Sequence, residues 1–280
     1  MNGTSDVISD LAADGDEVDR LVRDLGPDGW AAPTPAPGWT VAHQIAHLAA
    51  TFRMAGLAAA DPAAFEALAG RLSPDFDANV DAALRQFLPG TGHDAGTGYD
   101  GGTGHDELLR RWRAERENAV KALGALPPDQ PVPWLVRPIP AATLAAAGMM
   151  ELFGHGQDVA DALGVRRTHT DRLRHLVTFA VRTWDFGYQA RRLPTPAQPF
   201  RFEITGPSGT PWVYGPEAAT DRVRGSAVDF CLLVTRRRHP DDLDVRADGT
   251  EATRWLTIAQ AYRGPAGEGR RAGQFAAGPR

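Results

Sequence analysis

Amphipathic segments separated by proline-rich stretches dominate the first half of this chain of 280 residues. Apolar residues recur there with a period of about 3.6, which is typical of helices that bury one face. Proline interrupts the pattern because it disrupts a helix interior. Four substantial helices are predicted at residues 5–25, 41–59, 107–123 and 141–163, with shorter ones at 63–72 and 75–88. Helices joined in this way pack as a four-helix bundle, which we expect for residues 1–167.

The pattern changes after residue 167, where strand-like alternation first appears. The predicted elements are a helix at 170–191, paired strands at 200–205 and 212–214, an apolar helix or strand at 228–234 and a short helix at 254–262. We therefore expect a small α+β C-terminal domain over residues 168–264, followed by a disordered tail at 265–280. The expected fold class of the whole chain is mainly α.

Composition and charge disfavour several classes of function. The net charge of −5 gives no electrostatic support for binding nucleic acid or an anionic membrane. No apolar run reaches the ~20 residues of a membrane span. The first ten residues contain two aspartates and no basic run, unlike a signal peptide. We expect a cytoplasmic protein that binds neither nucleic acid nor membrane.

The single cysteine, Cys231, limits the metal chemistry of the chain. One thiol excludes a disulfide framework and any zinc or iron–sulfur site built on several cysteines. A metal in this protein would therefore be held by His, Asp and Glu side chains. Cys231 lies between Phe230 and Leu232, which is typical of a small residue in an apolar core.

Two pairs of polar side chains have the spacing of one helical turn. His43 and His47 are four residues apart in one predicted helix, and Glu151 and His155 are four apart in another. Residues with this spacing project from the same helix face. Two such pairs on facing helices of a bundle can converge on one metal ion. Spacing alone also fits buried histidines held by hydrogen bonds or an exposed Glu–His pair, but the apolar stretch before Glu151 means that its carboxylate needs a partner.

These pairs lie in motifs that resemble a known family. The motifs are PGWTVAHQIAHL at 37–48, MELFGHGQDV at 150–159 and GSAVDFCLLVTRRR at 225–238. Their order and spacing resemble the DinB-like superfamily, in particular the mycothiol-dependent maleylpyruvate isomerase family, seen mainly in actinobacteria. The third motif resembles the C-terminal segment of an actinobacterial subfamily of mostly unassigned activity. The resemblance covers roughly residues 5–263.

The resemblance implies a metal site at His47, Glu151 and His155. His43 matches a less fixed position of the motif, and we interpret it as a pocket residue rather than a ligand. Asp158, three residues after His155, either orients that imidazole or is a solvated carboxylate. Gln157 is a further candidate for the pocket lining.

The resemblance also implies a reaction type. A divalent ion, Zn²⁺ first and Ni²⁺, Fe²⁺ or Mn²⁺ as alternatives, would bind mycothiol and favour its thiolate, the reactive nucleophile. The thiolate, or a metal-activated water, would attack an electrophilic small molecule, as in an isomerase or a thiol transferase. Because the reactive thiol would come from mycothiol, Cys231 would have no catalytic role.

Three alternatives remain open from the sequence. The same pocket can serve a thiol-independent isomerase, cyclase or hydrolase of a biosynthetic pathway in secondary metabolism. The metal can be coordinatively saturated in a non-enzymatic metal-binding protein. The site can also have decayed, with the fold used for binding a small molecule.

Residues outside the ligand set are predicted to contact the substrate. Arg237 and Arg238 follow the apolar run of the second domain and would suit a carboxylate-bearing substrate, although a solvated basic turn fits equally. Trp39 and Trp134 lie in the proline-rich loops and either line the pocket or pack against the bundle. We expect the second domain to close over the metal, and the protein to be a monomer or homodimer.

A glycine–threonine repeat occupies residues 90–106. It contains a formal GxGxxG, but no strand precedes it and no βαβ unit surrounds it, so a dinucleotide site is rejected. Its six-residue period does not match a calcium-binding β-roll. We interpret the repeat as a flexible loop, with a lid over the site as the alternative.

Overall fold

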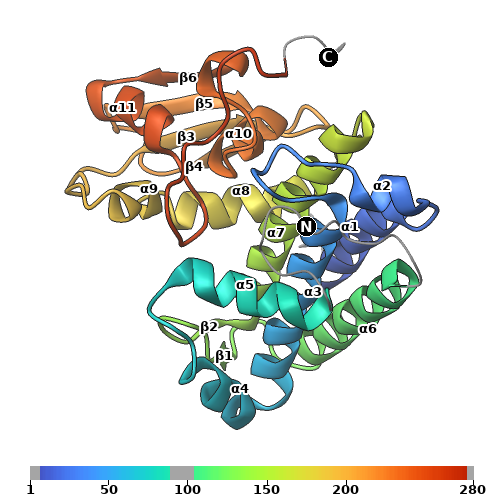
Figure 1. Cartoon of the computed structure of the whole chain (residues 1–280). Coiled ribbons are helices and arrows are strands. Elements are labelled where there is room, and N and C mark those ends of the chain that lie inside the picture. Colours follow the sequence, from blue (N-terminus) through green and yellow to red (C-terminus); the bar gives the residue numbers. More distant parts are fainter. Residues whose placement is uncertain (1–6, 89–103, 276–280) are drawn as a thin grey trace. The chain divides into compact units, whose positions relative to one another are not determined.

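The computed structural model of the chain describes residues 7–88 and 104–275 (Figure 1). The chain divides into two compact units, residues 1–167 and 168–280. The first unit is helical apart from two very short strands, and the second combines helices with a small sheet, so the predicted fold class is confirmed. Most of the glycine–threonine repeat, up to residue 103, lies outside the described residues.

Four long helices form the frame of the first unit. They are α1 (Val7–Val22), α3 (Val41–Ala60), α6 (Gly104–Gly124) and α7 (Ala141–Leu163). α3 packs against both α6 and α7, and α1 packs against the same two helices. Shorter helices complete the unit: α2 (Pro27–Ala31), α4 (Pro62–Ala69) and α5 (Phe76–Phe87). α3 is thus the central helix, and it carries the first of the two histidine motifs.

Small residues let the central helices approach closely. A Cβ added at Gly56 of α3 would lie 3.2 Å from the Cα of Ala119 in α6. A Cβ at Gly148 of α7 would lie 3.1 Å from the side chain of Leu11 in α1. α7 ends at Gly164, which has φ 65° and so caps the helix in the left-handed conformation that the sequence predicts.

The proline-rich segments are more ordered than predicted. The segment 30–39, which its prolines predict to be a loop, begins within a helix. This helix, α2, starts at Pro27, a position where a fixed φ favours a helix, and ends at Ala31. The loop that follows is closed by a β-bridge between Pro33 and Thr40. The expected loop at 131–140 contains a short antiparallel pair, β1 (Pro131–Val132) with β2 (Ile139–Pro140).

The second unit is built on a four-stranded sheet in the order β4-β3-β5-β6. The strands are β3 (Arg201–Thr205), β4 (Pro211–Tyr214), β5 (Arg222–Ser226) and β6 (Val245–Asp248). β3 pairs antiparallel with β4 and parallel with β5, and β5 pairs antiparallel with β6. Alternate residues of β3 are buried, and its Phe202 packs edge-on against Phe230 and Trp255 in an aromatic core.

Helices of the second unit differ in detail from the prediction. The single helix expected at 170–191 is two, α8 (Leu173–Arg182) and α9 (Phe186–Ala190). A Cβ at Gly187 would lie 2.1 Å from the carbonyl oxygen of Ile258, so α9 packs tightly against α11 (Thr250–Ile258). The ambiguous apolar segment at 228–234 is part of a helix, α10 (Ala227–Val234), capped by the Ser226 side chain. A 3₁₀ turn, η1, spans Pro240–Asp242.

The predicted disordered tail differs from the structure over residues 265–275. The backbone N–H of Gly273 donates to the Asp242 carboxylate, and Arg236 donates to the carbonyl of Gly267 at 3.3 Å. The guanidinium of Arg238 lies 3.8 Å from the ring centroid of Phe275. These two hydrogen bonds and the cation–π contact fix the glycine-rich segment, and amino-acid composition alone does not indicate them. Residues 276–280 lie outside the described part of the chain.

Among the described helices, none has the length and hydropathy needed to cross a membrane.

Substitution of Gly56 tests the close approach of α3 and α6. Gly56→Val would push methyl groups into the α6 backbone, and we expect it to lower the free energy of unfolding by about 1–3 kcal/mol, as overpacking does. Gly26→Val is the matched control, because nothing lies within 4 Å of its added Cβ. Urea unfolding followed by circular dichroism measures both. Equal stability of the two variants would contradict the proposed contact.

Candidate metal centre

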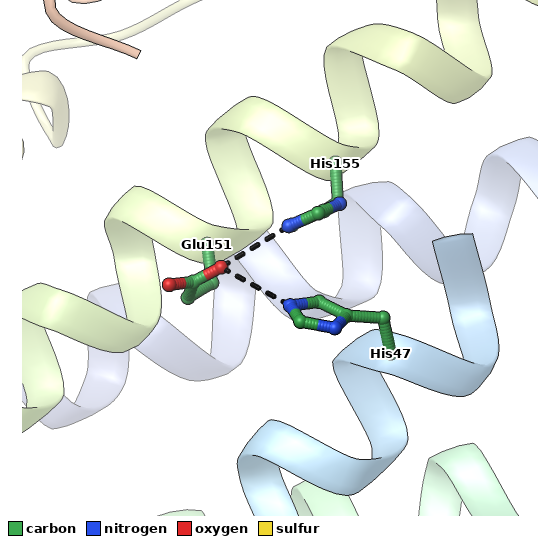
Figure 2. A group of neighbouring side chains, drawn as sticks. All are labelled: His47, Glu151 and His155. Atoms are coloured by element: carbon green, nitrogen blue, oxygen red, sulfur yellow. Dashed lines mark ion pairs between the residues drawn. The ribbon is translucent and has the colours of Figure 1, made fainter. Parts of the chain in front are cut away.

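Three side chains from α3 and α7 meet inside the first unit. His47 comes from α3, and Glu151 and His155 come from successive turns of α7 (Figure 2). An oxygen of Glu151 lies 3.2 Å from Nε2 of His155 and 3.7 Å from Nε2 of His47. One potential ligand atom from each residue lies within 4.8 Å of the others. Two segments more than a hundred residues apart in the chain therefore build a single cluster.

The spacing of these atoms fits a divalent ion. Two ligands about 2.0–2.1 Å from one tetrahedral zinc ion lie roughly 3.4 Å apart. The distances of 3.2 and 3.7 Å bracket that value. Two imidazoles and one carboxylate are also the donor set of catalytic zinc sites that keep a position open for water or substrate. The donor set and the spacing of its atoms therefore fit a divalent ion.

The helix segments that carry the two polar pairs are buried except at four partly exposed residues: His43, His47, Glu151 and His155. Over residues 41–50, all residues except His43 and His47 are buried. Over residues 151–160, all except Glu151 and His155 are buried. The side chain of Glu151 is 23% exposed, so an ion and a small ligand can reach it. The helical periodicity that buries one face thus leaves the polar pairs on a partly open stripe.

The electrostatics of the cluster favour a charged carboxylate. Burial by itself raises the pKa of Glu151, but hydrogen bonds from His155 and His47, together with their positive charge, outweigh burial. The pKa of Glu151 therefore lies well below its usual range. A ligating carboxylate has to be ionised, so this environment prepares Glu151 for a cation.

Trp39 forms an aromatic wall beside the imidazoles. Its ring stacks on His155 with centroids 6.0 Å apart and contacts His47 at 5.4 Å. The two imidazoles lie 4.5 Å apart. The loop that carries Trp39 is closed by hydrogen bonds from the N–H of Thr34 to the Trp39 carbonyl and from the N–H of Trp39 to the Ala36 carbonyl. The structure thus places Trp39 at the cluster.

Gln44 is a residue of the site that sequence reasoning missed. Its side chain is fully buried, and its Oε1 lies 2.6 Å from Nδ1 of His155. The sequence offers Asp158 either as the residue that orients His155 or as a solvated carboxylate, and the structure shows Asp158 buried. Gln44, on the other helix, accepts a hydrogen bond from Nδ1 of His155. A second polar residue beside His43 in an otherwise apolar stretch, 41–46, was the available signal for Gln44.

The structure shows the following contacts for the other nominated residues of the first unit. Nδ1 of His43 accepts a hydrogen bond from the Thr40 N–H at 3.3 Å, so His43 caps α3. Nε2 of Gln157 donates to Asp161 at 2.8 Å. Trp134 stacks on Phe65 of α4 with centroids 5.5 Å apart, which is a packing contact.

Arg237 and Arg238 belong to the second unit, just after α10. Both are half-buried and donate to backbone carbonyls, Arg237 to that of Thr235 at 2.6 Å and Arg238 to that of Arg237 at 2.7 Å. These bonds define their local conformation within that unit.

Two family models match the chain. The model described as "Mycothiol maleylpyruvate isomerase N-terminal domain" matches residues 11–160, which include all three residues of the cluster. The model described as "Wyosine base formation" matches residues 196–248, which contain β3 to β6.

Similar proteins span both units. Uncharacterized proteins of Mycobacterium tuberculosis strains CDC 1551 / Oshkosh and H37Rv are each 45% identical over 263 residues, covering 94% of this chain and 97% of the relative. Crystal structures of the mycothiol-dependent maleylpyruvate isomerase and of its histidine-to-alanine mutant are 15% identical, with TM-scores of 0.48 and 0.49. They cover 81% of this chain and 86% of theirs.

Metal binding should stabilise the protein through the three-residue cluster. We expect Zn²⁺ added to chelator-treated protein to raise the thermal midpoint, since a ligand at 100 times its Kd contributes about 2.7 kcal/mol. His155→Ala and His47→Ala should remove the increase. His239→Ala is the control, because His239 lies in the second unit and caps η1. Undiminished zinc content by elemental analysis in the double variant would contradict the assignment.

Proposed function

Because the chain belongs to the mycothiol maleylpyruvate isomerase N-terminal domain family, within the DinB-like superfamily, we propose that it is a metal-dependent enzyme that uses mycothiol on an electrophilic small molecule. The reaction class is isomerisation, in which the thiol adds and later leaves, or thiol transfer, in which it stays. The family membership supports an isomerase- or transferase-like enzyme. The thiol requirement and the electrophile are the parts proposed for this chain.

The arrangement of His47, Glu151 and His155 is the observation that carries this proposal. Three protein ligands leave one position of a tetrahedral ion for an exogenous group. A purely structural site would be closed by a fourth protein ligand. When bound, a divalent ion favours the deprotonated, nucleophilic form of a thiol at neutral pH.

The protein's own residues have separate roles in this proposal. Glu151 supplies the negative charge that balances the ion, and its low pKa keeps that charge in place. The two imidazoles supply neutral nitrogen donors. Trp39, stacked on His155, limits access from one side and presents an apolar surface to a ligand.

The sulfur in this proposal comes from outside the chain. Cys231 is buried on α10 of the second unit, whereas the three ligands lie in the first. Arg237 and Arg238 are proposed to bind a carboxylate of the substrate, because a guanidinium fork matches a carboxylate geometrically. The proposed partner is therefore a small anionic electrophile together with mycothiol.

Cobalt substitution tests the thiol requirement. We expect the Co²⁺-loaded protein to gain a near-ultraviolet charge-transfer band when mycothiol is added, because sulfur would bind the ion directly. S-methylated mycothiol, which has no ionisable thiol, should give no such band. The band should also be absent in His47→Ala.

Turnover separates thiol-dependent from thiol-independent chemistry. The zinc-loaded protein is assayed with and without mycothiol on a panel of electrophilic carboxylic acids that includes maleylpyruvate. Turnover only with mycothiol supports the proposal. Turnover that does not depend on mycothiol, with no cobalt band, would assign the site to a hydrolase, cyclase or isomerase that needs no thiol.

Substitution of Cys231 tests the external origin of the sulfur. Cys231→Ala should keep the cobalt band and thiol-dependent turnover unchanged, while the small cavity lowers the free energy of unfolding by about 1 kcal/mol. Activity assays and urea unfolding measure the two effects. Loss of turnover in a folded Cys231→Ala protein would show that the chain supplies the reactive thiol itself.

A further inference from the structure

The His155 ring is held at both nitrogens by side chains of known hydrogen-bonding character. Its Nε2 lies 3.2 Å from Glu151, and its Nδ1 lies 2.6 Å from Oε1 of Gln44. An amide oxygen only accepts, so Nδ1 has to donate in this contact. Nδ1 of His155 therefore carries a proton, and Nε2 is the nitrogen that faces the Glu151 carboxylate.

The orientation of the Gln44 amide is fixed in turn by the loop before α3. Nε2 of Gln44 donates to Oγ1 of Thr34 at 2.9 Å, and the Thr34 hydroxyl donates to the carbonyl of Trp39 at 2.9 Å. The hydroxyl has one proton, and the Trp39 carbonyl accepts it. Thr34 therefore needs a donor from Gln44, which places the amide nitrogen at Thr34 and the amide oxygen at His155.

We propose that Gln44 is a positioning residue that keeps Nδ1 of His155 protonated and fixes the orientation of the ring, through a chain of hydrogen bonds from the Trp39 carbonyl through Thr34. This assignment rests on the proposed metal site only where it concerns affinity. The bond between Nδ1 and Gln44 is a property of the protein without a metal.

Burial makes these hydrogen bonds effective. The Gln44 side chain is fully buried, so water does not compete for Nδ1 of His155. The residue is 111 positions away from His155, and the bond therefore ties α3 to α7 at the level of the cluster. Partners of this kind on the far nitrogen of a ligating histidine typically contribute about 10- to 100-fold to metal affinity.

The 33–40 loop has two effects on the same imidazole. Trp39 stacks its indole on the His155 ring, and its carbonyl ends the hydrogen-bond chain that reaches Nδ1. Gly38 has φ 76°, a conformation that favours glycine, and it lets the chain turn so that both contacts form. One short loop thus sets both the plane and the protonated nitrogen of His155.

Ring nitrogen NMR of the metal-free protein tests the protonation of Nδ1 directly. The wild type should show a protonated Nδ1. Gln44→Leu removes the acceptor and should leave Nδ1 unprotonated, with the ring proton on Nε2 beside Glu151. Gln44→Glu keeps an acceptor and should retain the protonated Nδ1. Gln260→Leu is the matched control, a buried glutamine of the second unit bonded to backbone carbonyls.

Metal affinity is the second readout. Chelator competition with Zn²⁺ should give about 10- to 100-fold weaker binding for Gln44→Leu and near-wild-type binding for Gln44→Glu and Gln260→Leu. An unprotonated Nδ1 in the wild type, or a protonated Nδ1 in Gln44→Leu, would overturn the proposal. Unchanged zinc affinity in Gln44→Leu would overturn the part that concerns metal binding.

Two further arms keep the test decisive. If Gln44→Leu does not fold, Thr34→Val replaces it, because loss of the hydroxyl frees the Gln44 amide to rotate and should leave Nδ1 of His155 only partly protonated. A fully protonated Nδ1 in Thr34→Val would then overturn the relay. If the wild-type protein binds no metal, the proposed function fails, while the NMR measurement still decides the role of Gln44.

Discussion

Close packing of α3 against its neighbours is the constraint on which the site depends. His47 meets Glu151 and His155 only because α3 and α7 pack side by side, which brings the two imidazole centroids to 4.5 Å. Glycines at the helix contacts allow close packing: Gly56 of α3 lies beside the α6 backbone, and a Cβ added at Gly148 of α7 would lie 3.6 Å from the Phe52 ring of α3. The same contact lets the buried Gln44 reach His155 across the interface. Helix packing and site geometry therefore have one cause.

The charge balance of the cluster follows from its position. A carboxylate placed among buried helix residues is unfavourable unless a partner compensates it. Glu151 has two such partners, the imidazoles of His155 and His47, and their contribution outweighs burial in setting its pKa. A divalent cation would compensate the carboxylate more fully and would release any protons held by the imidazoles. The arrangement thus favours a metal ion over an isolated ion pair.

Sequence periodicity predicted more of the fold than of the site. Apolar spacing located the long helices of the first unit, because a helix face repeats locally. The break between α8 and α9 escaped it, since the carbonyl of Trp184 in that break accepts a hydrogen bond from Nε1 of Trp255, distant in the chain. The same limit applies to the site: the i, i+4 pairs were visible, but Gln44 was not, because its partner is 111 residues away. The sequence suggested Asp158 as a residue that orients His155 because the two are only three residues apart in the chain.

The candidate metal site lies entirely within the first unit. Trp39, Gln44 and the three-residue cluster all fall within residues 11–160, the span of the isomerase-domain model. The Mycobacterium tuberculosis relatives, at 45% identity over 263 residues, share the second unit as well. Because the second unit contributes none of the three residues of the cluster, the metal binding that we propose depends on the first unit alone. In the second unit, the half-buried guanidinium groups of Arg237 and Arg238 are the groups that we propose for an anionic substrate, since a guanidinium fork matches a carboxylate.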